Sequence, residues 1–239
     1  MKKKNLITLS LLLIGIFGIN AQNQKLQAET ERFIYTKQVL YVAPDFVETY
    51  NGSPYNSDSF LLGNIYINKE LTKSDVAMRY NIYSDEMQIK ESLQSEDKDI
   101  TALIKSPDIS VTILNETFIY VPKGKGLEKG GYFQVATTGK TYSLYKKLGK
   151  EYFEASKAKT SFERDVPAKF EDRTSYYIHF SNGGMVELPK SKKKRYKAFG
   201  ESEALVKAYA KERKLDITKE KDLKRVIIYL DTNKSITQK

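Results

Sequence analysis

Along the first four fifths of the chain, apolar and polar residues alternate, which is typical of β-strands with one buried face. In residues 76–90 the apolar positions are even-numbered at first and odd-numbered afterwards. A two-residue turn at Ser84-Asp85 restores one continuous apolar face, and a β-bulge would do the same. The same test predicts turns at Asn115-Glu116, Thr138-Gly139 and Asn182-Gly183-Gly184. The predicted cross-strand pairs are Ile82 with Met87, Tyr80 with Ile89, Ile113 with Phe118, Val111 with Tyr120, Val135 with Tyr142, Phe133 with Leu144, Phe180 with Val186, and Ile178 with Leu188.

Two further strands are predicted at Phe33–Val42 and Phe60–Asn68, separated by a loop over Asp45–Ser59 that is rich in turn formers. Consecutive hairpins with one apolar face form an antiparallel sheet. Such a sheet either exposes its second face to solvent or folds into a sandwich or barrel. We therefore expect a β-rich body over residues 22–189.

After Pro189 the apolar residues follow a helical period instead. A helix is predicted over Lys219–Leu230, with Thr218 as its N-cap, and a second one over Glu201–Lys214. The predicted fold is α+β: an antiparallel sheet of consecutive hairpins, followed by two C-terminal helices that pack on it. Residues 190–239 thus form a basic run plus a helical hairpin.

Residues 1–21 have the form of a bacterial secretory signal peptide. Lysines at positions 2 to 4 precede the apolar stretch Leu6–Ile19, and small residues precede Gln22. This stretch is shorter than the roughly 20 apolar residues of a permanent membrane helix. We expect cleavage before Gln22 and a periplasmic protein without a transmembrane segment, with peripheral attachment to the outer membrane as an alternative.

Charge is unevenly distributed along the chain. The formal net charge is +10, and residues 190–239 alone hold 16 Lys and Arg against seven Asp and Glu. The signal carries three further lysines, so the β-rich body is slightly acidic. Basicity is therefore a property of the C-terminal fifth.

The absent residue types exclude several kinds of site. One histidine and no cysteine exclude ordinary zinc, copper and iron–sulfur centres, and no cofactor is expected. A Ser-His-Asp arrangement could use only His179, which we expect on an exposed face opposite Glu187. The lack of tryptophan weakens a carbohydrate-stacking site, although 17 tyrosines leave that interpretation open.

Three local patterns suggest ligand sites but have plainer explanations. Gly139-Lys140-Thr141 lacks the earlier glycine of a phosphate-binding loop. The glycine- and lysine-rich stretch Pro122–Gly131 suits a linker between strands as well as an anion site. Acidic residues at Asp85-Glu86 and Glu96–Asp99 are interpreted as solvated turns, because the twelve-residue calcium-loop pattern is missing.

The strongest local feature is Lys190–Lys197, with six basic residues in eight. It can bind anionic envelope material such as lipid headgroups or lipopolysaccharide, without specific recognition of nucleic acid. The alternative is a solvated basic linker between the sheet and the helices. The candidate anion-binding residues are Lys192, Lys193, Lys194 and Arg195.

Several segments together resemble an uncharacterised family of exported, β-rich proteins of Bacteroidota with no assigned activity. They are GSPY at 52–55, LLGNIYIN at 61–68, RYNIYSDEMQIK at 79–90, TFIYVPKG at 117–124, PAKFEDRTSYYIHF at 167–180 and EKDLKRVIIYLD at 220–231. Family members often run directly from the last strand into a helix, whereas here the basic run intervenes. The resemblance implies export and a single β-rich unit with a helical end, and it implies no catalytic or binding residues.

On function, two classes remain open. The first is a non-enzymatic binding or scaffolding protein of the cell envelope, whose partners are envelope proteins or anionic envelope material. The second is a hydrolase that acts on envelope polysaccharide with paired carboxylates, because glycoside hydrolysis needs only two such groups.

Overall fold

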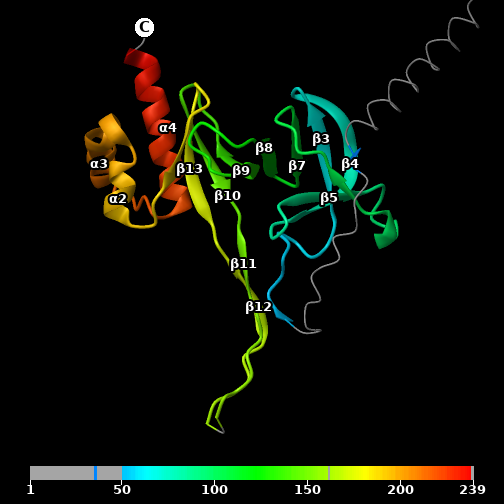
Figure 1. Ribbon diagram of the computed structural model, residues 1–239. Helices are drawn as coiled ribbons and strands as arrows, with labels where there is room; N and C mark the ends of the chain where they lie inside the picture. Colours follow the sequence, from blue (N-terminus) through cyan, green and yellow to red (C-terminus); the bar gives the residue numbers. More distant parts are fainter. Residues whose placement is uncertain (1–34, 37–49, 161, 238–239) are drawn as a thin grey trace, which may run out of the picture.

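The computed structural model describes residues 35–36, 50–160 and 162–237. The predicted signal peptide and most of the predicted strand at 33–42 lie outside these residues. The α+β prediction is confirmed: strands up to Leu188 form an antiparallel sheet, and helices follow (Figure 1).

The main sheet has eleven strands in the order β1-β6-β5-β4-β3-β7-β8-β9-β10-β13-β14. It is open, with β1 and β14 at its edges, so it forms neither a sandwich nor a barrel. The strands are β1 (Tyr35–Thr36), β3 (Leu61–Ile67), β4 (Glu70–Asn81), β5 (Glu86–Lys90), β6 (Thr101–Leu103), β7 (Ile109–Ile113), β8 (Glu116–Val121), β9 (Gly131–Thr137), β10 (Tyr142–Lys147), β13 (Ser175–Phe180) and β14 (Met185–Leu188). A short 3₁₀ turn at Asp97–Asp99 precedes β6.

A second, three-stranded sheet forms an arm that projects from the body (Figure 1). It consists of β11 (Lys150–Phe153), β12 (Ala168–Asp172) and the short β2 (Tyr50–Asn51). Phe170 of β12 anchors the base of the arm, because its ring lies 5.4 Å from that of Tyr83 in the β4–β5 loop. The arm continues β10 and β13 outward beyond the main sheet.

The C-terminal region contains α3 (Glu203–Glu212) and α4 (Glu220–Thr237), as predicted, with a 3₁₀ turn at Gly200–Ser202 before α3. Helix α4 packs on β9 and β10. Its predicted apolar stripe is almost completely buried and consists of Leu223, Val226, Ile227 and Leu230. Thr218 is not the cap that we predicted, because α4 begins at Glu220 and the carbonyl of Lys219 accepts its first helical hydrogen bond, from the N–H of Leu223.

The basic run is helical, which the sequence did not predict. Residues Lys192–Lys197 form α2, and the N–H of Arg195 bonds to the carbonyl of Ser191. This segment is therefore a helix and not an irregular linker. The described C-terminal region has three helices rather than the predicted two.

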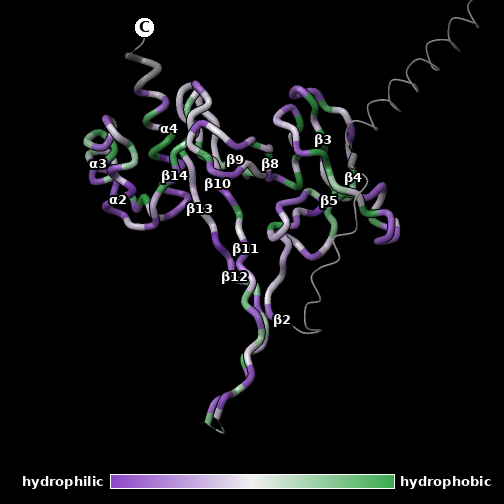
Figure 2. The backbone as a smooth tube through the Cα atoms, viewed as in Figure 1, coloured by the Kyte–Doolittle hydropathy of each residue, from purple (hydrophilic) through white to green (hydrophobic). Residues whose placement is uncertain are grey.

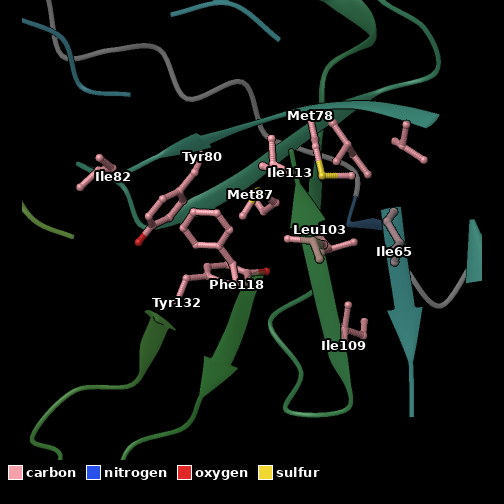
Figure 3. Packing of buried hydrophobic residues seen from close by; sticks show 13 residues of the cluster. Ile65, Met78, Tyr80, Ile82, Met87, Leu103, Ile109, Ile113, Phe118 and Tyr132 are labelled. Carbon is pink, nitrogen blue, oxygen red and sulfur yellow. The ribbon is translucent and has the colours of Figure 1, made fainter. Parts of the chain in front are cut away.

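Three apolar clusters hold the protein together. One lies on the β3–β8 half of the sheet and is centred on Met78, Tyr80 and Phe118 (Figure 3). A second joins the other half of the sheet to the helices, and a third lies on the opposite face around Phe133 and Tyr145. Figure 2 shows apolar residues interspersed with polar ones along the strands and along α4. The two halves of the sheet thus bury their apolar residues differently, one face in the first half and both faces in the second.

All four predicted hairpins are present, but their registers differ from the prediction. Ile113 lies opposite Glu116 rather than Phe118, because the turn is Leu114-Asn115. The first and last hairpins are also displaced by two residues, with Tyr80 opposite Met87 and Ile178 opposite Val186. A displacement of two residues keeps every side chain on its predicted face. Accordingly, Ile82 and Met87 still belong to the same buried cluster.

The third hairpin is different, because a β-bulge lies between Leu144 and Tyr145. The bulge places Tyr145 opposite Val135, so Phe133 and Leu144 belong to clusters on opposite faces. The prediction that Phe133 and Leu144 share a face is wrong. The extra residue reverses the alternation within one strand.

The β9–β10 loop is held by a carboxylate of α4. Asp231 accepts hydrogen bonds from the N–H groups of Lys140, Thr141 and Tyr142, at 2.9, 2.6 and 2.9 Å respectively. Partial burial acts to raise the pKa of Asp231, but these three donors outweigh it and hold the pKa below its usual value. The backbone N–H groups next to Gly139 could bind an anion, and here a carboxylate of the same protein, Asp231, occupies that position.

Asp231→Asn should lower the free energy of unfolding by about 1 to 2 kcal/mol at pH 7, because an amide offers fewer acceptors to the three N–H groups. A depressed folded-state pKa stabilises the protein above the ordinary carboxyl pKa. That contribution is lost as the pH falls through the lowered value. Urea unfolding at pH 7 and at pH 3 should show a smaller difference between wild type and variant at pH 3. An undiminished difference at pH 3 would contradict this account.

Candidate functional site

A cavity of about 470 Å³ lies where the β4–β5 turn meets the β8–β9 loop and strands β9, β10, β13 and β14. Leu127 and Phe133 supply its apolar walls. Its polar lining contains three carboxylates, two ammonium groups and one phenol. These residues are Asp85, Glu128, Glu187, Lys129, Lys147 and Tyr177. Its volume falls in the usual range for small-molecule sites.

An ion pair between Asp85 and Lys147 forms one wall, with 2.8 Å between Oδ1 and Nζ. The same oxygen accepts the hydroxyl of Tyr80 at 2.5 Å and the N–H of Tyr132 at 3.1 Å. The ammonium group of Lys147 also donates to the carbonyl of Tyr132 at 3.0 Å. The pair therefore ties the β4–β5 turn to β9 and β10.

This network keeps its hydroxyl groups protonated. Burial, followed by the charge of Asp85, raises the pKa of both Tyr80 and Tyr132 far above neutrality. Burial lowers the pKa of Lys147, although the negative charge of Asp85 acts in the opposite direction. The phenols of Tyr80 and Tyr132 therefore do not exchange protons near pH 7.

The backbone at two positions allows the ion pair between Asp85 and Lys147 to form. Asp85 has a φ of +55°, a left-handed conformation that Asp and Asn adopt more readily than most residues. Any side chain at Gly131 would collide with Lys147 Nζ and with the Asp85 carboxylate. A glycine at this position therefore lets the two charges meet.

The opposite wall comes from β13 and β14. Tyr177 lies directly across the ladder from Glu187, and its ring stands perpendicular to that of Phe133 at 5.3 Å. Burial, followed by the charge of Glu187, raises the pKa of Tyr177 to about 12. The phenol therefore remains a hydrogen-bond donor at any physiological pH.

The glycine-rich loop between β8 and β9 covers the mouth of the cavity. Gly126 has a φ of +100°, and a Cβ at this position would collide with the carbonyl of Met185. The loop therefore lies directly against β14, and it places Glu128 and Lys129 at the opening. The linker interpretation of Pro122–Gly131 misses this role.

The arrangement suits binding of a polar ligand. Glu128 and Glu187 accept hydrogen bonds or pair with a cation, whereas Lys129, Lys147 and Tyr177 donate. In the described part of the chain, no group of three or more His, Asp or Glu side chains is placed to hold a metal ion. The chemistry of the cavity is that of hydrogen bonding and charge pairing against an apolar floor.

His179 does not face Glu187 as predicted, because it pairs with Met185. Its ring stacks on Tyr145 at a centroid distance of 4.9 Å. Burial, followed by the charge of Lys125, lowers the pKa of His179, so the imidazole is neutral at pH 7. The structure gives His179 a packing role.

The four residues proposed as an anion site divide into two kinds. Lys192, Lys193 and Lys194 are exposed on α2, and Lys192 lies 3.5 Å from Asp216. Arg195 is only 5% exposed, and its guanidinium donates to the carbonyls of Pro189 and Ile217. The structure therefore does not bring Arg195 together with the lysines on the surface.

Sequence reasoning missed the cavity because its lining comes from five separate segments of the chain. Asp85 was interpreted as part of a solvated turn and Glu128 as part of a linker. The one local signal is the combination of a turn aspartate with glycines at 126 and 131, which a close backbone approach requires.

No protein-family model matches the chain, and no curated protein or solved structure is significantly similar to it. Among the described residues, no helix has both the length and the apolar character needed to cross a membrane.

Proposed function

We propose that the protein is an exported, non-enzymatic binding protein of the cell envelope and that the cavity described above is its ligand site. The cavity carries this proposal, because Asp85 and Lys147 in its wall are held in place before any ligand arrives. Preorganised polar groups lower the entropic cost of binding. The ligand is a polar molecule or a partner segment that offers donors to Glu128 and Glu187.

A photo-reactive amino acid in place of Glu128, at the mouth of the cavity, tests this function in cells that export the protein. We expect a discrete adduct from this position. The matched control is the same substitution at Ile228, whose side chain is 52% exposed on α4. Identical adducts from both positions, or none from position 128, would argue against the cavity as the ligand site.

A carboxylate-dependent hydrolase is the second candidate, and one observation favours it: Glu128 and Glu187 line the same cavity. Two carboxylates suffice for glycoside hydrolysis. The measurement is the release of reducing ends from envelope polysaccharide by the purified protein. A hydrolase should lose this release in both Glu128→Gln and Glu187→Gln, whereas no release by the wild type would exclude the activity.

The exposed lysines of α2 provide a separate contact for anionic envelope material. Such binding should be salt-sensitive, because charges at a surface are screened over about 8 Å at physiological ionic strength. Retention on lipopolysaccharide at low salt should fall when Lys192, Lys193 and Lys194 are all changed to serine. Equal retention of both proteins would mean that these lysines are only solvated.

A further inference from the structure

The end of the arm presents an aromatic side chain to solvent. Figure 1 shows the arm extending well beyond the rest of the molecule. Phe162 lies in the connection from β11 to β12, beyond the bridge between Ser156 and Val166, and 98% of its surface is exposed. Single exposed apolar residues are common on protein surfaces. Phe162 differs in that it belongs to the connection at the end of a long projection, where its side chain is almost fully exposed.

Hydrogen bonds give this tip a defined shape. Ser156 and Val166 exchange two backbone hydrogen bonds, at 2.9 and 2.8 Å. Beyond them, Asp165 accepts the N–H of Ala158 at 2.8 Å. A tip that is already ordered loses little conformational entropy when it docks.

The charges around Phe162 are arranged asymmetrically. The carboxylate of Glu163 accepts the N–H of Lys159 at 2.9 Å, so Glu163 and Asp165 both turn toward backbone amides. In the described residues, the basic side chains of Lys157, Lys159 and Arg164 form no ion pair, and all three are exposed. These three basic side chains are therefore free to contact an anionic group, while Glu163 and Asp165 keep their negative charges.

We propose that the arm tip docks on a lipid bilayer surface, with Phe162 inserted among the headgroups and the three basic side chains at the phosphates. A flat surface meets the end of a projection first, and this end exposes an aromatic side chain. Long basic side chains beside it can keep their charges at the headgroups while their stems follow the ring. This inference concerns a different surface from the cavity and does not depend on the cavity's function.

Insertion of the Phe162 ring should contribute more to this binding than attraction between basic side chains and lipid phosphates. Residues 154–167 carry three basic and three acidic side chains, so their formal charges cancel. Binding through the tip should therefore respond only weakly to salt, in contrast to binding through the lysines of α2. Phe162→Ser should lower the vesicle partition coefficient by about tenfold, the loss expected for a partly buried aromatic side chain.

The chain contains no tryptophan, so Phe162→Trp creates a single fluorescent reporter at the tip. The substitution should not disturb folding, because the side chain is almost fully exposed. The protein is titrated with vesicles of zwitterionic lipid containing about one third anionic lipid, at low and high salt. We expect the tryptophan emission to shift to shorter wavelength in both, as the indole leaves water.

Ile228→Trp on α4 is the matched control and should show no shift with the same vesicles. A shift at position 228 but not at 162 would overturn the proposal in favour of contact through the helices. A shift at 162 that grows with protein concentration without vesicles would also overturn it, in favour of a protein partner or a second copy. No shift at 162 at millimolar lipid would overturn it outright.

Discussion

Asp85→Asn should lower the free energy of unfolding by about 3 kcal/mol, the low end of the loss expected when one partner of a buried ion pair is removed. The low end applies because the Lys147 and Asp85 side chains are 25% and 23% exposed. The variant leaves an ammonium group and the hydroxyl of Tyr80 facing a weaker acceptor. Asparagine tolerates the left-handed conformation at this position, so the change isolates the lost charge from backbone strain. Urea unfolding at pH 7 measures the effect.

The double variant Asp85→Asn/Lys147→Met provides the control. Without the unpaired ammonium group, it should be more stable than Asp85→Asn alone, because a buried charge without its partner costs more than the loss of both charges. If Asp85→Asn unfolds within about 0.5 kcal/mol of the wild type, as ordinary surface substitutions do, the pair does not join the two halves of the sheet.

The elements of the fold were readable from the sequence because side chains on a strand alternate between faces. The same periodicity explains the register errors. Pairing Tyr80 with Met87 or with Ile89 leaves the same residues on the apolar face, so alternation cannot distinguish the two registers. Only the loop distinguishes them, and here it has four residues, because Ile82 is buried within it while Asp85 turns toward β9.

The β9–β10 hairpin shows where alternation fails altogether. Both faces of these strands are covered, by α4 on one side and by the cluster around Phe133 on the other. When both faces are apolar, a bulge between Leu144 and Tyr145 leaves no mark on the pattern. A sequence pattern shows which side chains are buried. When both faces of a strand are buried, the pattern no longer shows which residues of the neighbouring strand lie opposite.

The candidate site was beyond sequence reasoning for a different reason. Asp85 and Lys147 are 62 residues apart, and nothing local distinguishes a turn carboxylate in solvent from one that accepts three hydrogen bonds. The basic run illustrates the same limit. Its residues have similar charge in the sequence, yet the helical period places Lys194 in solvent and Arg195 in the interior.

Arg195→Ala should lower the free energy of unfolding by about 3 kcal/mol. Its Nε donates to the carbonyl of Pro189 at 2.7 Å, and its Nη1 donates to that of Ile217 at 2.8 Å. One side chain thus joins the end of the sheet to the connection between α3 and α4. Alanine leaves both carbonyls without this donor and opens a void at a position that is 5% exposed.

Two companion variants distinguish this structural role from a loss of basic charge. Arg195→Lys keeps the charge but has a single ammonium group in place of the planar guanidinium, so it should recover only part of the stability. Lys194→Ala removes a charge at the neighbouring, exposed position and should change stability by less than about 0.5 kcal/mol. Hydrogen exchange should show faster opening of α4 in Arg195→Ala, because the connection that leads into this helix is no longer tied to the sheet. Equal losses in Arg195→Ala and Lys194→Ala would show that the net charge of α2, rather than the two carbonyl contacts, sets the stability of this region.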